Sequence, residues 1–446
     1  QGAPDISAMG CLTGSFTYLR STDLLNMGRK SFYYDFKGNI VQDNEADRGY
    51  LHRNYYKYTF TNKIAEQAIT HRPIIRSYKY FSEKYKYWYD QDRPIKVEYT
   101  LNDTIDRKEV NFAWESTYND LGHLQSQTFL QNNRRFTYGY DLHERLIKII
   151  GPYFEQSWGY SYSGNISHIN WKVNSGKKQG YNFSYDGLHR LTSARYREEG
   201  RESNHYHCSY TYDKQGNITS LTRNGLTDGN TFGKIDDLSF RYDVNQLIAV
   251  DDAAEDPLSY GSFNFRDGDK SGESEYGYDA NGNLIFDKNA GIAHITYNLL
   301  NQPERIQYTN GNIIMYTYDG LGKKHMASYQ TAISGITVPF GSRFDLSSSQ
   351  RSALLTTSYY GNIIYNNTGS YDENDPFIVT NQVGYCDKNA VGDLVQHYYE
   401  KDHQGNNRIV ASNQVEEVNH YYPYGGLFGE SVTNGDNLFR YNGKEH

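Results

Sequence analysis

Three observations predict an all-β protein made of repeated antiparallel β-hairpins that join in one continuous sheet. A short unit recurs along the chain, its aromatic and apolar residues alternate with the period of a strand, and little of the sequence has helical periodicity. The 446 residues include 45 tyrosines and 40 glycines but only nine prolines, few enough to leave strand ladders intact. The repeat therefore outweighs chain length, which alone would suggest about three domains.

The unit is clearest at Glu275–Phe286, which reads EYGYDANGNLIF. Tyr276 and Tyr278 are two residues apart, so on a strand they point to the same face. Asp279 begins a turn, because its carboxylate can accept bonds from the backbone NH groups just ahead. Gly282, or the asparagine after it, supplies the positive φ that such a turn needs. The apolar residues that follow start a second strand, and the unit is predicted to be a hairpin.

Copies of this unit share a Tyr-Asp or Tyr-Asn pair and, after the turn, apolar residues that begin the second strand. Successive tyrosines at positions 118, 140, 162 and 185 lie 22 or 23 residues apart, a period typical of repeat architectures. A second aromatic residue two positions earlier predicts ladders of stacked rings between neighbouring hairpins, as at Tyr210/Tyr212 and Tyr276/Tyr278. The predicted structural positions are Tyr34, Asp35 and Gly38; Tyr140 and Asp141; Tyr185 and Asp186; Tyr212, Asp213 and Gly216; Tyr242 and Asp243; Tyr278, Asp279 and Gly282; and Tyr318, Asp319 and Gly322.

We expect a single domain over residues 1–446. Residues 1–110 are divergent hairpins, 111–330 are regular repeats, and 331–358 form an off-period loop or insertion. Strand patterning returns over 359–446, and the only short helix candidates are 62–69 and 251–255.

Composition excludes several classes of function. A net charge of −8, without a basic stripe, argues against binding to nucleic acid or an anionic membrane surface. No apolar run approaches the ~20 residues that span a bilayer. No signal peptide opens the sequence, so Gln1 is expected to be a cleaved or cropped start. Cys11, Cys208 and Cys386 lie far apart and are expected to be lone thiols rather than a disulfide pair.

Candidate chemistry is sparse. The motifs of serine hydrolases, phosphate-binding loops, zinc proteases and Cys-x-x-Cys redox centres are absent from the sequence, so we expect a non-enzyme without an organic cofactor. An acidic segment resembles the opening of a calcium loop, with oxygen ligands at Asp267, Asp269, Ser271 and Glu273, but Tyr278 stands where a bidentate Glu belongs. The alternative for this segment is a solvated acidic loop.

One further cluster could hold zinc. His205 and His207 are expected on one strand face beside Cys208, and no partner motif supplies further ligands. Histidines that line a sheet are the favoured interpretation.

The repeats and several longer segments resemble the rearrangement-hotspot (Rhs) or YD-repeat proteins, and the resemblance covers most of the chain. The segments are 162–172 (YSGNISHINWK), 399–410 (YEKDHQGNNRIV), 419–428 (NHYYPYGGLF) and 440–445 (RYNGKE). The last two resemble the start of the Rhs-associated core, which would begin within 359–446. Its motif positions here are Tyr422, Pro423, Gly425, Tyr441, Asn442 and Gly443.

This resemblance implies a long antiparallel sheet wound into a spiral that forms a hollow shell, open at its C-terminal end in this chain. It implies a non-catalytic, encapsulating segment of a secreted bacterial protein of the polymorphic-toxin type, with a C-terminal toxin on the same or another polypeptide. The alternative is a cell-surface adhesion or carbohydrate-binding module that uses the aromatic face of the sheet, with a glycan as its partner.

The sequence departs from the family at its end. It stops at His446, where the core normally continues, and lacks the paired Asp-Pro-x-x-Gly element of self-cleaving relatives; the Asp-Pro pairs at 256–257 and 375–376 are interpreted as turns. We therefore expect strands near 410–439 at a free or partner-paired edge, with the tyrosine-rich face unshielded on one side and self-association through that edge.

Overall fold

The computed structural model describes residues 14–18, 27–47, 50–73, 80–104, 106–228, 230–254, 264–268, 273–319, 322–367, 378–433 and 437–444. The described residues are almost entirely strands and short turns, which confirms the all-β, repeated-hairpin class. Two compact units are present. The first unit comprises Gln1–Arg135, Tyr316–Ser328 and Leu355–His397, and the second unit comprises Phe136–Met315, Tyr329–Leu354 and Tyr398–His446.

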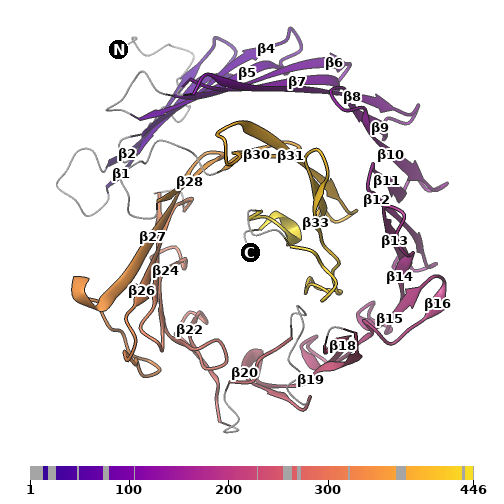
Figure 1. Cartoon of the computed structure of the whole chain (residues 1–446), viewed down its shortest axis with the longest axis vertical. Helices are drawn as coiled ribbons and strands as arrows, with labels where there is room; N and C mark the ends of the chain where they lie inside the picture. The colour runs from indigo at the N-terminus through magenta and orange to yellow at the C-terminus, as the bar shows by residue number, and fades with distance from the viewer. Residues whose placement is uncertain are drawn as a thin grey trace. The chain divides into compact units, whose positions relative to one another are not determined.

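The strands belong to two antiparallel sheets, and Figure 1 follows them in chain order. The first sheet contains β1 (Gly14–Tyr18), β2 (Met27–Tyr34), β3 (Ile40–Asp47), β4 (Tyr50–Tyr58), β5 (Ile64–Pro73), β6 (Phe81–Asp90), β7 (Arg93–Asp103), β8 (Lys108–Tyr118), β9 (Leu124–Phe129), β10 (Arg134–Tyr140), β11 (Leu146–Ile150), β12 (Phe154–Tyr160), β13 (Ile166–Val173), β14 (Gln179–Tyr185), β15 (Leu191–Glu198), β16 (Arg201–Glu202), β17 (Cys208–Tyr212), β18 (Ile218–Leu226), β19 (Phe232–Asp243) and β20 (Gln246–Asp252).

The second sheet contains β21 (Tyr276–Tyr278), β22 (Leu284–Asp287), β23 (Ile292–Tyr297), β24 (Pro303–Tyr308), β25 (Ile313–Tyr318), β26 (Lys324–Ala332), β27 (Arg351–Tyr360), β28 (Ile363–Asn367), β29 (Ile378–Asn381), β30 (Gly384–Lys388), β31 (Leu394–Lys401), β32 (Asn407–Ala411) and β33 (Val415–Val418). Two 3₁₀ turns, η3 (Ser348–Gln350) and η4 (Tyr441–Gly443), are the helical elements labelled among the described residues. The domain boundaries expected from the sequence stay a prediction.

The turn of the repeat has a defined hydrogen-bond pattern, seen between β21 and β22. The Asp279 backbone NH donates to the Asn283 carbonyl at 2.9 Å, and the Gly282 NH donates to the Asp279 carbonyl at 3.0 Å. Asp279 Oδ1 accepts bonds from the NH groups of Asn281 and Asn283, while Oδ2 accepts from the Asn283 amide. Gly282 has φ +81°, which confirms the predicted positive φ. These bonds also hold the pKa of Asp279 below its usual value.

The same turn, with the same side-chain hydrogen bond, recurs along the chain. In each copy the first turn residue accepts a bond from the backbone NH four positions later; besides Asp279, these residues are Asp35, Asn119, Asp141, Asp186, Asp213, Asn298, Asp319, Asn389 and Asp402. The copy at Tyr242-Asp243 differs. There Asp243 pairs with Gln246 across a two-residue turn, and Val244 has φ +56°, a conformation unusual for a β-branched residue.

The tyrosine of the pair connects its hairpin to the preceding one. A register shift marks a β-bulge at Tyr278, and the Tyr278 hydroxyl donates at 2.8 Å to the carbonyl of Leu247, near the start of β20. Across the described hairpins such bonds measure 2.7 to 3.1 Å. They join Tyr58 to Ile40, Tyr89 to Ile64, Tyr118 to Pro94, Tyr160 to Leu146, Tyr185 to Ile166, Tyr212 to Leu191, Tyr242 to Ile218, Tyr278 to Leu247 and Tyr297 to Leu284.

Ring contacts follow the predicted ladders only in part. Trp171 on β13 and Tyr181 on β14 belong to neighbouring hairpins and lie 5.7 Å apart between ring centroids. Tyr210, however, meets Tyr424 of the C-terminal segment edge-on at 5.3 Å. The ring ladder is incomplete because many tyrosines are oriented by their hydroxyl bonds instead.

Two local predictions are wrong. The helix candidate at 62–69 lies mostly in β5, which pairs with β4 and β6. Residues 251 and 252 of the second candidate close β20, and 255 lies outside the described residues. Strand pairing on both sides outweighs the weak local helical preference at these positions.

The C-terminal segment, or tail, is the last part of the second unit, Tyr398–His446, and its described residues contribute to the core of that unit. Phe428 is fully buried, and its ring stacks on Tyr206 at a centroid distance of 3.7 Å. The same cluster contains Phe154, Trp158, Trp171, Tyr181, Tyr196, Tyr206, Ile409, Ala411, Tyr422 and Phe428. The expectation of an unshielded aromatic face near 410–439 is therefore wrong for this unit, since the tail itself covers the rings of β12–β17.

A buried carboxyl group lies in the first unit. Glu83 on β6 is 2 % exposed; it accepts bonds from the Tyr99 hydroxyl at 2.9 Å and from the Asn362 amide at 2.8 Å. Burial raises the pKa of Glu83 to about 7. This group therefore carries a proton in the folded state at pH values where it is ionised in the unfolded chain.

The first prediction concerns the tyrosine hydroxyl. Tyr278→Phe removes the donor to the Leu247 carbonyl and leaves the ring in place, so we expect a loss of about 1 kcal/mol in the free energy of unfolding. Denaturant unfolding of the purified chain measures it. Tyr162→Phe is the matched control, because Tyr162 is fully exposed. Equal stability of the two variants would contradict the proposed role of the bond.

The second prediction concerns pH. Between the ordinary pKa of 4.5 and about 7, folded Glu83 holds a proton that the unfolded chain releases, so its contribution is present below pH 4.5 and is lost as pH rises through 7. Over that range we expect the wild type to lose on the order of 3 kcal/mol relative to Glu83→Gln. Chemical denaturation of both proteins from pH 4.5 to 8 measures the difference. Parallel stability curves would refute the shifted pKa.

Candidate functional site

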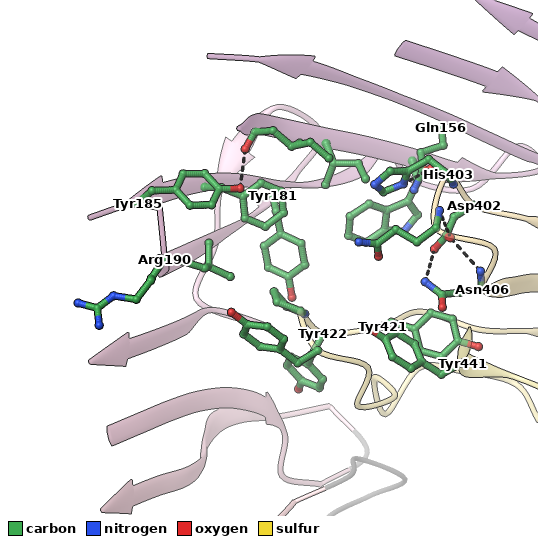
Figure 2. Close-up of a pocket in the computed structure, with 18 of the residues that line it drawn as sticks. Gln156, Tyr181, Tyr185, Arg190, Asp402, His403, Asn406, Tyr421, Tyr422 and Tyr441 are labelled. Carbon is green, nitrogen blue, oxygen red and sulfur yellow. Dashed lines mark hydrogen bonds between the residues drawn. The ribbon is translucent and has the colours of Figure 1, made fainter. Parts of the chain in front are cut away.

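The second unit contains a pocket of about 400 Å³ between β12–β17 and the C-terminal segment (Figure 2). One group of lining residues is aromatic: Trp171, Tyr181, Tyr185, Tyr212, Tyr421 and Tyr424. A second group is polar: Gln156, Arg190, Asp402, His403, Asn406 and Arg408. Rings and planar polar groups thus face one another across a single pocket.

Arg190 is positioned by the repeat turn. It takes the place that Asn283 has in the reference unit, and its Nε donates to Asp186 Oδ2 at 2.6 Å. Its Nη1 donates to the Asp213 carbonyl of the next turn at 2.7 Å, and its guanidinium lies 4.7 Å from the centre of the Tyr212 ring. The backbone NH and guanidinium of Arg190 hold the pKa of Asp186 below its usual value. A fixed cation therefore stands at the pocket wall.

The opposite wall is the turn that begins at Asp402, another copy of the repeat turn. Asp402 Oδ1 accepts bonds from the NH groups of Gln404 and Asn406, each at 3.0 Å, and Oδ2 accepts from the Asn406 amide at 3.0 Å. Figure 2 shows Asp402 and Asn406 joined in this way. The carboxylate is thus used to hold the turn.

Arg408 is a buried cation beneath the pocket. Its guanidinium lies 4.9 Å from the ring centre of Phe154 and 5.0 Å from that of Trp171, and its Nε donates to the Asn419 carbonyl at 2.7 Å. Nη1 stands 3.7 Å from Asp402 Oδ2. Burial lowers the pKa of Arg408, and the aromatic faces together with the carboxylate offset the cost of removing its charge from water.

Burial lowers the pKa of two histidines here: His403, which lines the pocket, and His420, which contacts the lining residue Trp171. His420 Nδ1 accepts a bond from Trp171 Nε1 at 3.0 Å, and burial lowers the pKa of His420 to about 3. The His403 ring lies 4.6 Å from that of Trp158, its Nδ1 is 3.1 Å from Gln156 Oε1, and burial lowers its pKa as well. The Gln156 Nε2 donor is buried and has no hydrogen-bond partner among the described residues.

The residue types that line the pocket suit the binding of a ligand. The described residues that line the pocket include no serine, cysteine or lysine to act as a nucleophile, and Asp402 is engaged in its own turn. Aromatic faces beside arginine and amide groups suit a neutral, ring-shaped ligand with hydroxyl groups.

The structure brings the residues of the predicted core motif together beside this pocket. Tyr422 is buried and its hydroxyl donates to the Asn224 carbonyl at 2.8 Å, while Pro423 lines the pocket. Gly425 has φ +109°, and a Cβ there would come within 2.7 Å of the Tyr441 ring.

Two further motif residues fix the end of the described chain. The Asn442 NH donates to Asn406 Oδ1 at 2.9 Å, and Asn442 itself has φ +53°. Gly443 follows with φ +64°. The tail is thereby attached to the turn at Asp402.

The predicted calcium site lies only partly within the described residues. Asp267 Oδ2 accepts a 3.4 Å bond from the Asp252 NH, Glu273 is exposed, and Asp269 and Ser271 lie outside the described residues, so calcium binding stays a prediction.

The expected pair of histidines on one strand face is wrong. His205 and His207 lie before β17 in a turn, and His205 stacks on the Phe232 ring at 3.8 Å. Cys208 and Cys386 are both buried free thiols, and burial raises the pKa of Cys208 to about 12; Cys11 lies outside the described residues.

Sequence reasoning missed the pocket. Gln156, Arg190 and Arg408 each occupy ordinary hairpin positions, and no local pattern marks them. The one sequence feature that could have indicated the pocket is the tyrosine- and glycine-rich run at 419–428. It contains more aromatic residues than the reference unit at 275–286.

Comparison with known proteins agrees with the fold. The family model described as Teneurin YD-shell matches residues 151–340. A structure described as TcdB2-TccC3-Cdc42 has a TM-score of 0.57 and 14% identity, over 97% of this chain and 24% of that chain. The chain thus spans about a quarter of the length of that structure. A search of the curated proteins finds no match.

Weaker likeness extends to TcdB2-TccC3-TEV, with a TM-score of 0.45 and 11% identity over 97% of this chain and 28% of that one. The Photorhabdus luminescens Tc holotoxin pore with a TccC3-D651A mutation has a TM-score of 0.44 and 12% identity, over 94% of this chain and 24% of that one. With TM-scores below 0.5, these two likenesses are too weak to define a fold.

The hairpin repeat and the family match define a protein with the YD-shell fold. More specifically, the fold is similar to that of the YD-repeat shell in the TcdB2-TccC3-Cdc42 structure, and the family match over residues 151–340 agrees with the resemblance found in the sequence. Among the described residues, no helix has the length and apolar character needed to cross a membrane.

Proposed function

We propose that this chain is a non-catalytic wall segment of a secreted bacterial Rhs-type toxin protein, which encloses a C-terminal effector. The observation that supports the proposal is the fold: hairpins added in chain order, with 97% of the chain resembling part of the TcdB2-TccC3-Cdc42 structure. The effector, or the rest of the core, would lie on the same or another polypeptide.

The physical design of the repeat suits a wall. Each hairpin contacts its neighbours through strand pairing and through the tyrosine hydroxyl bond, so hairpins can be added without enlarging a central core. Few aliphatic residues are then needed, which fits a hydrophobic fraction of 37% and an aromatic fraction of 15%. A wall of this kind is stable without contributing chemistry of its own.

The third prediction tests enclosure in the natural polypeptide that carries this segment, or in its complex with a separately encoded effector. Under native conditions, we expect an effector domain encoded beyond residue 446 to survive a protease concentration that digests the isolated effector. Mass spectrometry of the surviving fragments measures it. Equal digestion of the enclosed and isolated effector would refute the shell function, as would a reading frame with neither a continuing core nor an effector gene beside it.

A second candidate function is supported by the pocket. Its rings, the fixed guanidinium of Arg190 and the buried amide of Gln156 are the groups that bind carbohydrates, so the chain could serve as a glycan-binding or adhesion module at the cell surface. Tyr424 is the ring to test, because it lines the pocket and is 62% exposed.

The fourth prediction separates the two functions. On a glycan array, we expect Tyr424→Ala to lose at least about fivefold in retention of any glycan that the wild type binds, since one lost stacking contact is worth about 1 kcal/mol or more. Tyr162→Ala is the control, an exposed tyrosine outside the pocket. Equal retention by both variants, or no glycan bound by the wild type, would refute the adhesion function and leave the shell proposal intact.

A further inference from the structure

A cluster of three potential metal ligands lies in the first unit. Glu45 is on β3, His325 is on β26, and Asp319 begins the turn between β25 and β26. His325 Nε2 stands 3.6 Å from Glu45 Oε1 and 3.6 Å from Asp319 Oδ2, and the three atoms all lie within 4.8 Å of one another. The side chains of His325, Glu45 and Asp319 are 8%, 12% and 14% exposed, so the cluster is largely shielded from water.

Both carboxylates are oriented through their other oxygen. Asp319 Oδ1 accepts the Lys323 backbone NH at 2.8 Å, which is the bond that holds the repeat turn. Glu45 Oε2 stands 3.6 Å from the ammonium of Lys30 and 3.9 Å from that of Lys323. Each carboxylate is thus fixed at one oxygen while its second oxygen faces the imidazole. Support of this kind for ligand side chains is typical of protein metal sites.

The distances between the three ligand atoms leave room for a bridging cation. One oxygen of each carboxylate stands 3.6 Å from His325 Nε2, so a single ion can contact all three groups. A cation in the plane of the three atoms and equally distant from them would lie no more than about 2.4 Å from each, close to the usual zinc distances to nitrogen and oxygen. A small movement of the side chains would complete the coordination.

We propose that Glu45, Asp319 and His325 bind one divalent transition-metal ion, with Zn²⁺ or Mn²⁺ as the class that suits one imidazole and two carboxylates. Water would complete the coordination. The ion would join β3 to the turn that precedes β26, segments far apart in the sequence, and would stabilise the first unit in proportion to its concentration. The site uses none of the residues of the acidic segment around Asp267.

The neighbouring lysines bear on the strength of binding. Lys30 and Lys323 partly neutralise Glu45, which lowers the attraction of the cluster for a cation but fixes the geometry before the ion arrives. The competing explanation is an ion-pair network of His325, the two carboxylates and the lysines that holds no metal. The two explanations differ in one measurable property, which is the binding of metal.

The fifth prediction uses the whole chain after treatment with a chelator and its removal. Isothermal titration with ZnCl₂, and separately with MnCl₂, is expected to show one equivalent bound for at least one ion and a higher melting temperature. Asp319→Asn should reduce the affinity by at least about tenfold, within the range seen when metal sites lose supporting groups. The turn should survive this change, because asparagine caps the same turn at Asn119, Asn298 and Asn389.

Asp279→Asn is the matched control, since it makes the same substitution in the same turn at Asp279, outside the cluster. Glu45→Gln is a second variant that should also weaken binding. Equal affinity in Asp319→Asn and Asp279→Asn would overturn the proposal and place the ion on other histidines. Absence of binding by the wild type would also overturn it, in favour of the metal-free ion-pair network.

Discussion

The hydrogen bond from each repeat tyrosine to the preceding hairpin is the interaction on which this architecture depends. Tyr212, for example, donates to the Leu191 carbonyl at 2.7 Å from a strand that also pairs through its backbone. The acceptor lies at the start of the second strand, next to the bulge, where the regular ladder is locally shifted. The side chain therefore reinforces the sheet where backbone pairing is least regular.

The residue that follows such a tyrosine, in several hairpins an aspartate, makes this possible. Asp213 accepts two backbone NH bonds at 2.8 Å, from Gly216 and Asn217, which fixes the turn directly after Tyr212. With the turn fixed, the direction of the tyrosine side chain is fixed as well. The Tyr-Asp pair thus acts as one unit: the acid closes a hairpin, and the phenol attaches that hairpin to its neighbour.

The second unit adds a different kind of stability through its tail. Glu400 is 3% exposed and accepts the NH groups of Tyr153 and Phe154, where β12 begins. Arg408 and Phe428 then pack against rings of the first sheet in this unit. A thin sheet buries little apolar area by itself, so a covering segment of aromatic residues supplies the burial that single hairpins lack.

These contacts explain what the sequence could and could not predict. The turn at Asp279 involves bonds over two to four residues, so its geometry follows from local chemistry. The contact of Trp171 with His420 joins residues 249 positions apart, and that of Phe154 with Glu400 joins residues 246 apart. No periodic pattern marks such pairs, because their partners are chosen by how the tail folds back and not by spacing along a strand.

The abundance of tyrosine is by itself no evidence of a binding function. A tyrosine such as Tyr242, whose hydroxyl is bonded to a neighbouring carbonyl and whose ring is half-buried, is accounted for by the fold. Tyr424 is different, because it is largely exposed beside the pocket and belongs to no repeat pair. A wall needs only tyrosines of the first kind, whereas recognition of an external ligand needs the second. The aromatic composition as a whole is therefore evidence of architecture, and any binding function rests on the few rings, Tyr424 foremost, that the architecture does not require.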